Sequence, residues 1–569
     1  MRVLGLSFSG HGSAACLVED GRVVHAVNLE RLTRVKFALA TLPEHRKRVA
    51  NVLRVAFGYD ELPHIADFYE VFPMMLEAVT GHRDLQDARI DLVVKTQDSI
   101  RPDDKSPEAY QRFLEFFGDT PVHFDLEHHL CHAYQAYLSS PFDEAAVMTV
   151  DGRGEDLERL GGGSLSMTLG VGTGDRVEVM KEVLFPSSVG GMYADVTRHL
   201  GFREEQEGNT MALAAFGTDA YHRTARDGAF ELHDDGGFEL AIDDTGIVHR
   251  ERMHAFCPKR ERGTDFTQDQ FDLAWAYQAF AEEILVHSTS KLQERTGQTR
   301  LAMAGGVALN CVANTEILRQ TEFEELYIFP NAGDRGLAAG CALYGYKVLL
   351  DGAERHPLTH DYLGPPNPDE EIVKALANAD GIEHHRSPDI AAECARLVAD
   401  GAIVGWVQGG GEFGPRALGH RSLIADPRSL DTKRRLDEEV KRREWFRPYA
   451  PSALAEHADE YFEMLGVDSP YMLLAVNTRD EVRDKVPAIV HVDGSARVQT
   501  VEQDVDPLYH RLISQFYELT GIPLVVDTSF NGYGEPMVET TEDALAAMHQ
   551  MGLDALAVGD HLVKPCSGQ

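Results

Sequence analysis

The chain has 569 residues, 43% of them hydrophobic, so it exceeds the size at which one core stops growing and at least two domains are expected. Its formal net charge of −38 argues against partners that need a basic surface, which are nucleic acids and anionic membranes. The seven cysteines form no CxxC pair, the N-terminus lacks a signal peptide, and no apolar stretch is long enough to span a membrane. These features predict a cytoplasmic α/β protein with reduced thiols.

Three strands are expected at the N-terminus. The apolar runs Val3–Phe8, Ala14–Val18 and Arg22–Val27 are separated by small polar turns, and the Glu-Asp-Gly turn before Arg22 is typical of a hairpin. His11 lies in the first turn, where an imidazole can face a bound molecule or tie the turn to a backbone carbonyl.

Two histidines are spaced as on one face of a helix. His128 and His132 are four residues apart, and Asp151 follows the apolar strand Ala145–Val150. A carboxylate at the tip of a neighbouring strand would complete a mixed nitrogen and oxygen site suited to divalent iron, manganese or zinc. For the histidine pair alone, two ordinary histidines on a helix are the alternative interpretation.

A long helix is expected after Asp151, followed by a further strand that ends in a glycine-rich turn. A glycine pair, Gly305 and Gly306, comes after the short strand Leu301–Ala304, where backbone amides can approach a nucleoside or phosphate closely. The apolar residues between Asp265 and Thr296 recur at roughly helical spacing. This organisation is typical of a duplicated nucleotide-binding α/β domain.

The domain junction is predicted in the proline-rich stretch 351–370. The expected domains are therefore 1–350 and 371–569. The second contains the predicted helix Asp389–Asp400 and the strands Ile403–Val407 and Ile522–Val526, again an α/β arrangement.

An island of basic residues lies in this acidic chain. Residues 416–447 contain ten Lys or Arg and six Asp or Glu, and a glycine-rich turn precedes them. Backbone amides and guanidinium groups together can hold several phosphate charges. We favour an anion site for Arg416, Lys441 and Arg447, which lie beside glycine, proline or aromatic residues, and a solvated helix face with ion pairs for Lys433–Arg435. Two later segments, His491–Thr500 and Val525–Gly532, are candidate partner loops, with ordinary turns as the alternative.

Six segments in fixed order resemble the antibiotic O-carbamoyltransferase family, which includes nodulation protein U. The resemblance covers nearly the whole chain. The segments are Glu30–Lys36, His128–Ala133, Gly305–Asn314, Gly414–Ser422, Arg443–Ser452 and Asp527–Gly532. The chain departs from the family pattern at Gly12 and Asn209, where the family usually has Asp and Lys.

The resemblance implies an actin-like ATPase domain similar to TsaD, followed by a YrdC-like domain. In this family the second domain makes carbamoyl-adenylate from carbamoyl phosphate and ATP with Mg²⁺, and the first passes the carbamoyl group to a hydroxyl of a small-molecule acceptor in antibiotic biosynthesis. Every site residue below is an expectation from the resemblance. The metal ligands, for Fe(II) in the family, are His128, His132, Asp151 and Asp334. The contacts to ATP and carbamoyl phosphate are Arg416, Lys441, Arg447, Arg497, Ser529 and Asn531, with Arg416 and Lys441 also catalytic. The first-domain contacts to carbamoyl-adenylate are Glu207, Gly305, Gly306 and Asn310. His11, as a catalytic base for the acceptor hydroxyl, is a hypothesis.

Other classes of protein remain as alternatives. A zinc peptidase needs a glutamate between its two histidines, whereas Glu127 precedes both here. A tRNA threonylcarbamoyl-type transferase is opposed by the negative charge, and a non-catalytic nucleotide-binding ATPase-fold protein would not need the basic island. The oligomeric state, a homo-oligomer included, stays open. Aromatic residues and methionines between 37 and 125 suit an apolar acceptor, but we favour a place in the hydrophobic core. They are Phe57, Tyr59, Phe68, Tyr69, Phe72, Met74 and Met75.

Overall fold

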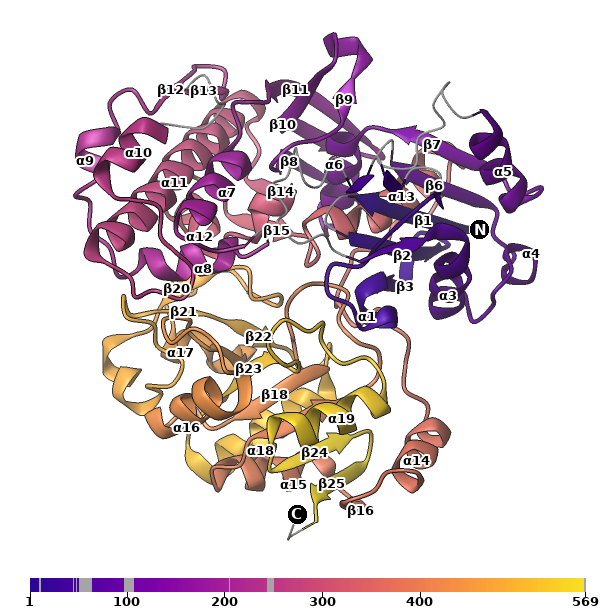
Figure 1. Cartoon of the computed structure of the whole chain (residues 1–569), viewed down its shortest axis with the longest axis vertical. Coiled ribbons are helices and arrows are strands. Elements are labelled where there is room, and N and C mark those ends of the chain that lie inside the picture. Colours follow the sequence, from indigo (N-terminus) through magenta and orange to yellow (C-terminus); the bar gives the residue numbers. More distant parts are fainter. Residues whose placement is uncertain are drawn as a thin grey trace. The chain divides into compact units, whose positions relative to one another are not determined.

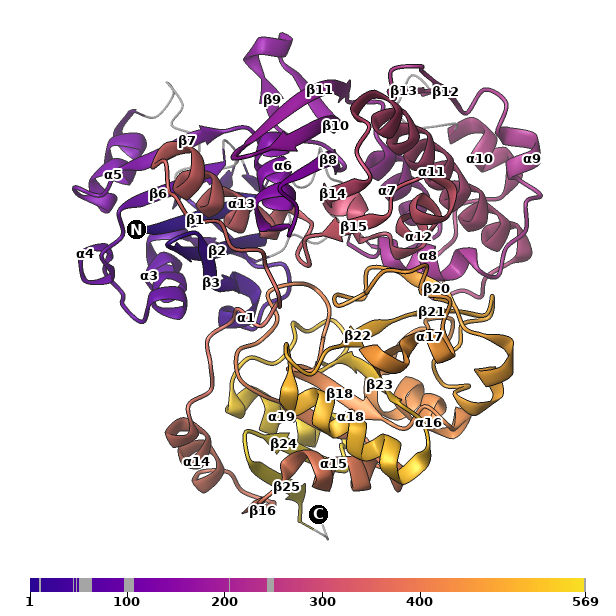
Figure 2. The same cartoon turned by 180° about the vertical axis from the view of Figure 1, so that it is seen from behind.

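The computed structural model describes residues 1–9, 12–43, 46–47, 49–50, 64–96, 107–203, 205–242 and 250–566. The chain forms two compact units, and both are discontinuous in sequence (Figures 1 and 2). The first unit contains Met1–Leu29 and Phe37–Leu358, and the second contains Glu30–Lys36 and Thr359–Gln569. The boundaries expected from the sequence did not place residues 30–36 with the second unit.

The first sheet of the first unit has the strand order β3-β2-β1-β6-β7. Its strands are β1 (Arg2–Ser9), β2 (Gly12–Glu19), β3 (Arg22–Asn28), β6 (Leu92–Thr96) and β7 (Val122–Leu126). The first three are antiparallel neighbours, whereas β6 and β7 run parallel to β1. The three N-terminal strands predicted from apolar runs between small polar turns are therefore confirmed.

The second sheet repeats this topology. Its order is β11-β10-β8-β14-β15, with the short β9 (Asp156–Leu157) beside β10. The strands are β8 (Glu144–Val150), β10 (Gly163–Thr173), β11 (Arg176–Leu184), β14 (Arg300–Ala304) and β15 (Glu325–Ile328). Again an antiparallel meander is extended by two parallel strands on the side of its first strand. The expected duplication is present as a repeated strand order.

Two helices separate the sheets. Helix α13 (Leu337–Tyr344) packs on β1, β2 and β6 and against α6 (His128–Ser139), which packs in turn on β8 and β14. The close approach of the helices needs Gly340, because a Cβ there would lie 2.6 Å from the Cys131 carbonyl oxygen. In α3 (Phe68–Thr80), Phe68, Phe72 and Met75 are buried, and the two phenylalanines belong to an aromatic cluster in the core. Tyr69 and Met74 are half-buried. The candidate acceptor residues Phe57 and Tyr59 lie outside the described residues.

The long predicted helix is also present. Helix α11 spans Gln268–Thr296 and begins with a capping box in which Thr267 and Gln270 exchange hydrogen bonds, and Gly297 ends it in the left-handed conformation. It packs on β8 and β10 and against α7 (Val189–His199), α8 (Glu207–Ala214) and α12 (Cys311–Gln320). Gln278 and Glu282, which interrupt its apolar stripe, hydrogen-bond to each other at 2.7 Å.

The second unit contains an eight-stranded mixed sheet with the order β16-β25-β24-β17-β18-β23-β19-β22. These strands are Ile382–Arg386, His561–Pro565, Ala555–Val558, Val404–Val407, Arg421–Ala425, Leu524–Ser529, Ala450–Leu454 and Gln499–Val501. Helices α15 (Ile390–Ala399) and α18 (Pro507–Thr520) pack together, and α19 (Thr541–Met551) covers β17 and β24. The fold class is therefore α/β in both units, as expected. No helix among the described residues combines the length and the apolar character needed to cross a membrane.

Candidate functional site

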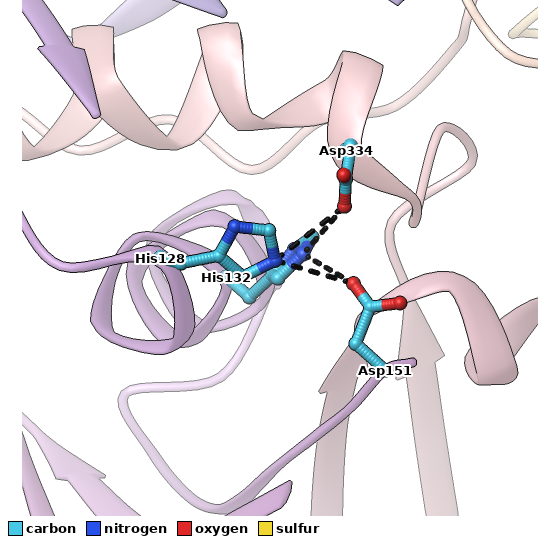
Figure 3. A group of neighbouring side chains, drawn as sticks. All are labelled: His128, His132, Asp151 and Asp334. Carbon is cyan, nitrogen blue, oxygen red and sulfur yellow. Dashed lines mark hydrogen bonds and ion pairs between the residues drawn. The ribbon is translucent and has the colours of Figure 1, made fainter. Parts of the chain in front are cut away.

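Four side chains from distant parts of the first unit converge at one point (Figure 3). Asp151 directly follows β8, and Asp334 begins the short helix η4 (Asp334–Gly336) after β15. Both follow parallel strands of the second sheet, whose carboxyl ends lie at the same edge. His128 and His132 come from the first turns of α6 and point toward this edge.

The donor atoms of these four residues lie within 4.8 Å of one another. The Nε2 atoms of His128 and His132 lie 3.3 and 3.1 Å from Asp151 Oδ2. They also lie 3.4 and 3.6 Å from Asp334 Oδ1. The two histidines are buried, and both carboxylates are largely buried.

Neighbouring groups fix the orientation of these side chains. The Nδ1 atom of His132 lies 2.8 Å from Gln135 Oε1, and the Gln135 amide donates to the Asn331 carbonyl, also at 2.8 Å. The Gly152 amide donates to Asp151 Oδ1 at 2.7 Å. Such outer contacts select the tautomer and the direction of a ligating imidazole.

The electrostatics of the cluster favour a cation. Burial alone would lower the pKa of His128, but Asp334 and Asp151 outweigh it and raise that pKa to about 10. Burial likewise opposes protonation of His132, whose hydrogen bonds to both carboxylates nevertheless raise its pKa. The two histidines hold the pKa of Asp151 well below its usual range despite burial. Two imidazole nitrogens and two carboxylate oxygens therefore fit a divalent metal ion of the borderline or hard type.

The intervening histidine is not part of this cluster. His129 Nδ1 lies 2.7 Å from Thr149 Oγ1, and burial lowers the pKa of His129 to about 3. Its neutral ring therefore has a structural role, tying α6 to Thr149 of β8.

The glycine pair borders the cluster. Gly305 has φ of +100°, and a Cβ there would lie 2.1 Å from the Val150 carbonyl oxygen. A Cβ at Gly306 would lie 3.0 Å from Asp151 Oδ1. Glycine is thus required at 305 by close packing of β14 on β8, and at 306 it leaves room beside a candidate ligand.

The other first-unit candidates have different surroundings. Asn310 caps α12 by accepting from the Ala313 amide at 3.1 Å, and its own amide donates to Gln278 at 3.0 Å. Glu207 is half-buried at the start of α8. His11 lies outside the described residues.

A second candidate site surrounds Lys441 in the second unit. The residue ends η6 (Leu436–Lys441), and its buried ammonium group has four acceptors from two residues. It donates to the Ser529 carbonyl at 2.6 Å and the Ser529 hydroxyl at 3.3 Å. It donates to the Asn531 carbonyl and side-chain oxygens at 2.8 and 2.7 Å. The structure thus brings together three of the six residues expected to contact the substrates of activation.

Several cationic side chains lie near Lys441. Burial, and then the charges of Arg443, Arg447 and Lys36, hold the pKa of Lys441 well below its usual range. Burial and Arg443 lower the pKa of Arg447 to about 10, and Arg497 of β21 (Ser495–Arg497) contributes to that shift. Arg443 lies 3.7 Å from Asp437 and Arg447 lies 4.0 Å from Glu444, so nearby carboxylates offset part of this charge. The mutual repulsion of the clustered cations, which lowers these pKa values, still favours a bound anion. By contrast, Lys433 and Arg434 form ion pairs with Asp437 and Asp431 within their own helical turns, as favoured from the sequence.

Arg416 lies in a separate loop, which Glu412 organises. The buried Glu412 Oε1 accepts from the amides of Leu418, His420 and Arg421 at 2.7, 3.0 and 3.2 Å. Asp361 holds the same loop through the Gly414 amide at 2.7 Å. The glycine-rich turn is therefore shaped by its own acidic residue, and it presents the half-buried Arg416.

Sequence reasoning missed the residues that position the two sites. Gln135 is three residues after His132, a spacing at which side chains on a helix meet, so a local signal existed. Glu412 lies in the glycine-rich turn just before Arg416, but nothing in the local sequence indicated its three backbone partners. Lys36 ends a segment used for the family resemblance, to which no role was given.

Comparisons with known proteins found family profiles, relatives and solved structures that are similar to this chain. The sequence profile described as "Carbamoyltransferase N-terminus" matches residues 112–343, and "Carbamoyltransferase C-terminus" matches residues 395–565. Nodulation protein NolNO of Sinorhizobium fredii is 35% identical, over 97% of this chain and 79% of that protein. The 3'-hydroxymethylcephem-O-carbamoyltransferase of Amycolatopsis lactamdurans is 26% identical over 97% of both chains. Among solved structures, full-length HypF in its phosphate- and nucleotide-bound form has a TM-score of 0.38 and 12% identity over 61% of this chain and 55% of that chain.

Proposed function

This chain belongs to the carbamoyltransferase family, and on that premise we propose that it is an ATP-dependent O-carbamoyltransferase with two separate sites. The second unit forms carbamoyl-adenylate from carbamoyl phosphate and ATP. The first unit transfers the carbamoyl group to a hydroxyl of a small-molecule natural product and releases AMP. With one water, the activation step also yields phosphate and pyrophosphate.

The observation that carries this proposal is the cation cluster around Lys441, which we call the activation site. Its members are Lys36, Lys441, Arg443, Arg447 and Arg497. The substrates of activation bear several phosphate charges, and negative charge develops as pyrophosphate leaves. Lys441 is buried, whereas the side chain of Arg447 is 38% exposed. Gathering several cations around one buried lysine is costly, and an anionic ligand would offset that cost.

Within the activation site, Lys441 is held in place before any substrate binds. Its four contacts to Ser529 and Asn531 leave little freedom for the side chain. We infer that Lys441 neutralises phosphate charge, that Arg447 and Arg497 bind phosphate oxygens through their planar guanidinium groups, and that Arg416 adds a further contact from its loop.

The transfer site is the cluster of His128, His132, Asp151 and Asp334, which would hold a divalent metal such as Fe(II). When bound, such an ion supplies Lewis acidity toward a carbamoyl or phosphate oxygen. Gly306 leaves space beside Asp151 for the adenylate. His11 stays our hypothesis for the base that takes the acceptor proton.

Two other functions fit less well. Glu127, the only glutamate beside the histidine pair in sequence, accepts from Arg159 at 2.8 and 2.7 Å, so it is engaged in a bidentate ion pair at the protein surface. This opposes a peptidase base. A tRNA acceptor is opposed by the negative charge of the chain.

The proposal is tested by measuring pyrophosphate release with ATP and carbamoyl phosphate together, and with each omitted. We expect release only when both are present. A panel of hydroxylated natural products, screened by mass spectrometry for carbamoylated products, then identifies the acceptor. Release of phosphate from ATP without any dependence on carbamoyl phosphate would indicate an ATPase instead.

A further inference from the structure

A short segment from the N-terminal part of the chain belongs to the second unit. Glu30–Lys36, which we call the strap, is flanked by Leu29 and Phe37 of the first unit. All three of its cationic residues contact the segment 535–543 of the second unit, which runs from a loop into the first turn of α19. Arg34 donates to the Pro536 carbonyl at 3.1 Å and lies 3.3 Å from Asp543. Lys36 donates to the Glu535 carbonyl at 3.2 Å.

Arg31 is the buried centre of the strap, with 3% of its side chain exposed. Its guanidinium group donates to the Val538 carbonyl at 3.2 Å and to the Glu412 carbonyl at 3.0 Å. It therefore bridges two loops that are more than a hundred residues apart. It also lies 3.7 Å from Glu539 Oε2, while Arg421 lies 3.6 Å from Glu539 Oε1.

Both of these loops carry expected substrate contacts, Arg416 in one and Ser529 and Asn531 in the other. On one side, the Glu412 carboxylate accepts hydrogen bonds from three backbone amides of the loop that carries Arg416. On the other, the Glu535 carbonyl accepts from both Lys36 and the Asn531 amide, the latter at 2.7 Å. Asn531 in turn accepts from Lys441 at 2.7 Å. A continuous hydrogen-bonded path thus runs from the strap to Lys441.

We propose that the strap is a positioning element of the activation site, and that Arg31 is its key positioning residue. By bridging the Glu412 and Val538 carbonyls, Arg31 sets the relative position of the Arg416 loop and the Ser529–Asn531 loop, so that their groups meet one substrate. The role of these groups as substrate contacts rests on the proposed function. The activation site is accordingly not contained in residues 359–569 alone, because part of it is supplied by the chain between β3 and β4 (Leu39–Thr41).

The test uses the full chain with Arg31→Lys. Lysine keeps the positive charge but lacks the two guanidinium NH₂ groups that donate to the two carbonyls. Arg31→Ala is avoided, because it would leave the buried Glu539 with one guanidinium partner fewer. The matched control is Arg22→Lys, an exposed arginine of β3 in the first unit. Three quantities are compared: the KM for carbamoyl phosphate in pyrophosphate release, the amide hydrogen exchange of residues 412–421 and 529–539, and the metal content.

For Arg31→Lys we expect a KM about tenfold higher or more, the size of one hydrogen bond to a charged group. Exchange should be faster in both loops and unchanged in the first unit, with normal metal content. Arg22→Lys should match the parent in all three. Parental exchange and KM in Arg31→Lys would overturn the proposal. If the parent itself releases no pyrophosphate, the proposed function fails, and the hydrogen exchange of the two loops still decides whether Arg31 positions them.

Discussion

At the scale of single residues, the two candidate sites have opposite electrostatics. Asp151 and Asp334 raise the pKa of His128 and His132, so the first site favours positive charge. In the second, burial and neighbouring cations lower the pKa of Lys441, so negative charge is favoured. A metal site and an anion site are therefore distinguished by the sign of the charge that the surrounding side chains concentrate.

Metal affinity of the first site is expected to rise with pH. Because the pKa of His128 is raised to about 10, its imidazole holds a proton at neutral pH that a metal must displace. This competition weakens as pH rises, so the dissociation constant for Mn²⁺ should fall by up to roughly tenfold per pH unit for each proton displaced. Competition with a chelator between about pH 6 and 8 measures this. A constant affinity over that range would show that His128 is not a ligand.

His132→Gln offers a matched test of the ligand set. Its Nε2 lies near both carboxylates, so its loss should remove most of the bound metal measured by elemental analysis. His129→Gln is the control, since His129 is buried in the same helix but contacts Thr149 instead. Equal metal loss in both variants would point to disruption of α6, not to loss of a ligand.

At the scale of elements, the sequence predicted the strands and helices whose residues follow a local pattern. Apolar runs separated by small polar turns predicted β1 to β3, and the helical spacing of apolar residues predicted α11. The histidine pair could be proposed from its spacing, and Lys441 from its place beside glycine, proline or aromatic residues. Asp334 needed the family resemblance. The contacts of Glu412 and the strap could not be predicted, because each joins segments distant in sequence.

The turn after β14 provides a stability prediction. Gly305→Ala would place a Cβ against the Val150 carbonyl at a φ of +100°, so it should lower the free energy of unfolding by about 2–5 kcal/mol. Gly208→Ala is the control: Gly208 lies in α8 with open space around it, and the change should stabilise by about 0.5–1 kcal/mol. Denaturant unfolding compares the two. Equal stabilities would mean that β14 does not pack on β8 as described.

At the scale of the whole molecule, two chemistries are assigned to two units of one chain. The metal cluster lies entirely in the first unit, and the cation cluster lies in the second, with Lys36 contributed by the strap. Carbamoyl-adenylate is hydrolysed easily, so a chain that makes and consumes it benefits from shielding it from water. The strap means that the units are linked by three chain crossings, at 29/30, 36/37 and 358/359.

The most direct test of this two-site account measures pyrophosphate release and metal content side by side in Lys441→Met and His132→Gln. Lys441→Met should lose pyrophosphate release by about a hundredfold or more, as expected when a preorganised charge is removed, and keep its metal. His132→Gln should lose its metal and keep ATP- and carbamoyl phosphate-dependent release. Parental release by Lys441→Met, or loss of release in His132→Gln, would contradict the assignment of activation and transfer to separate sites.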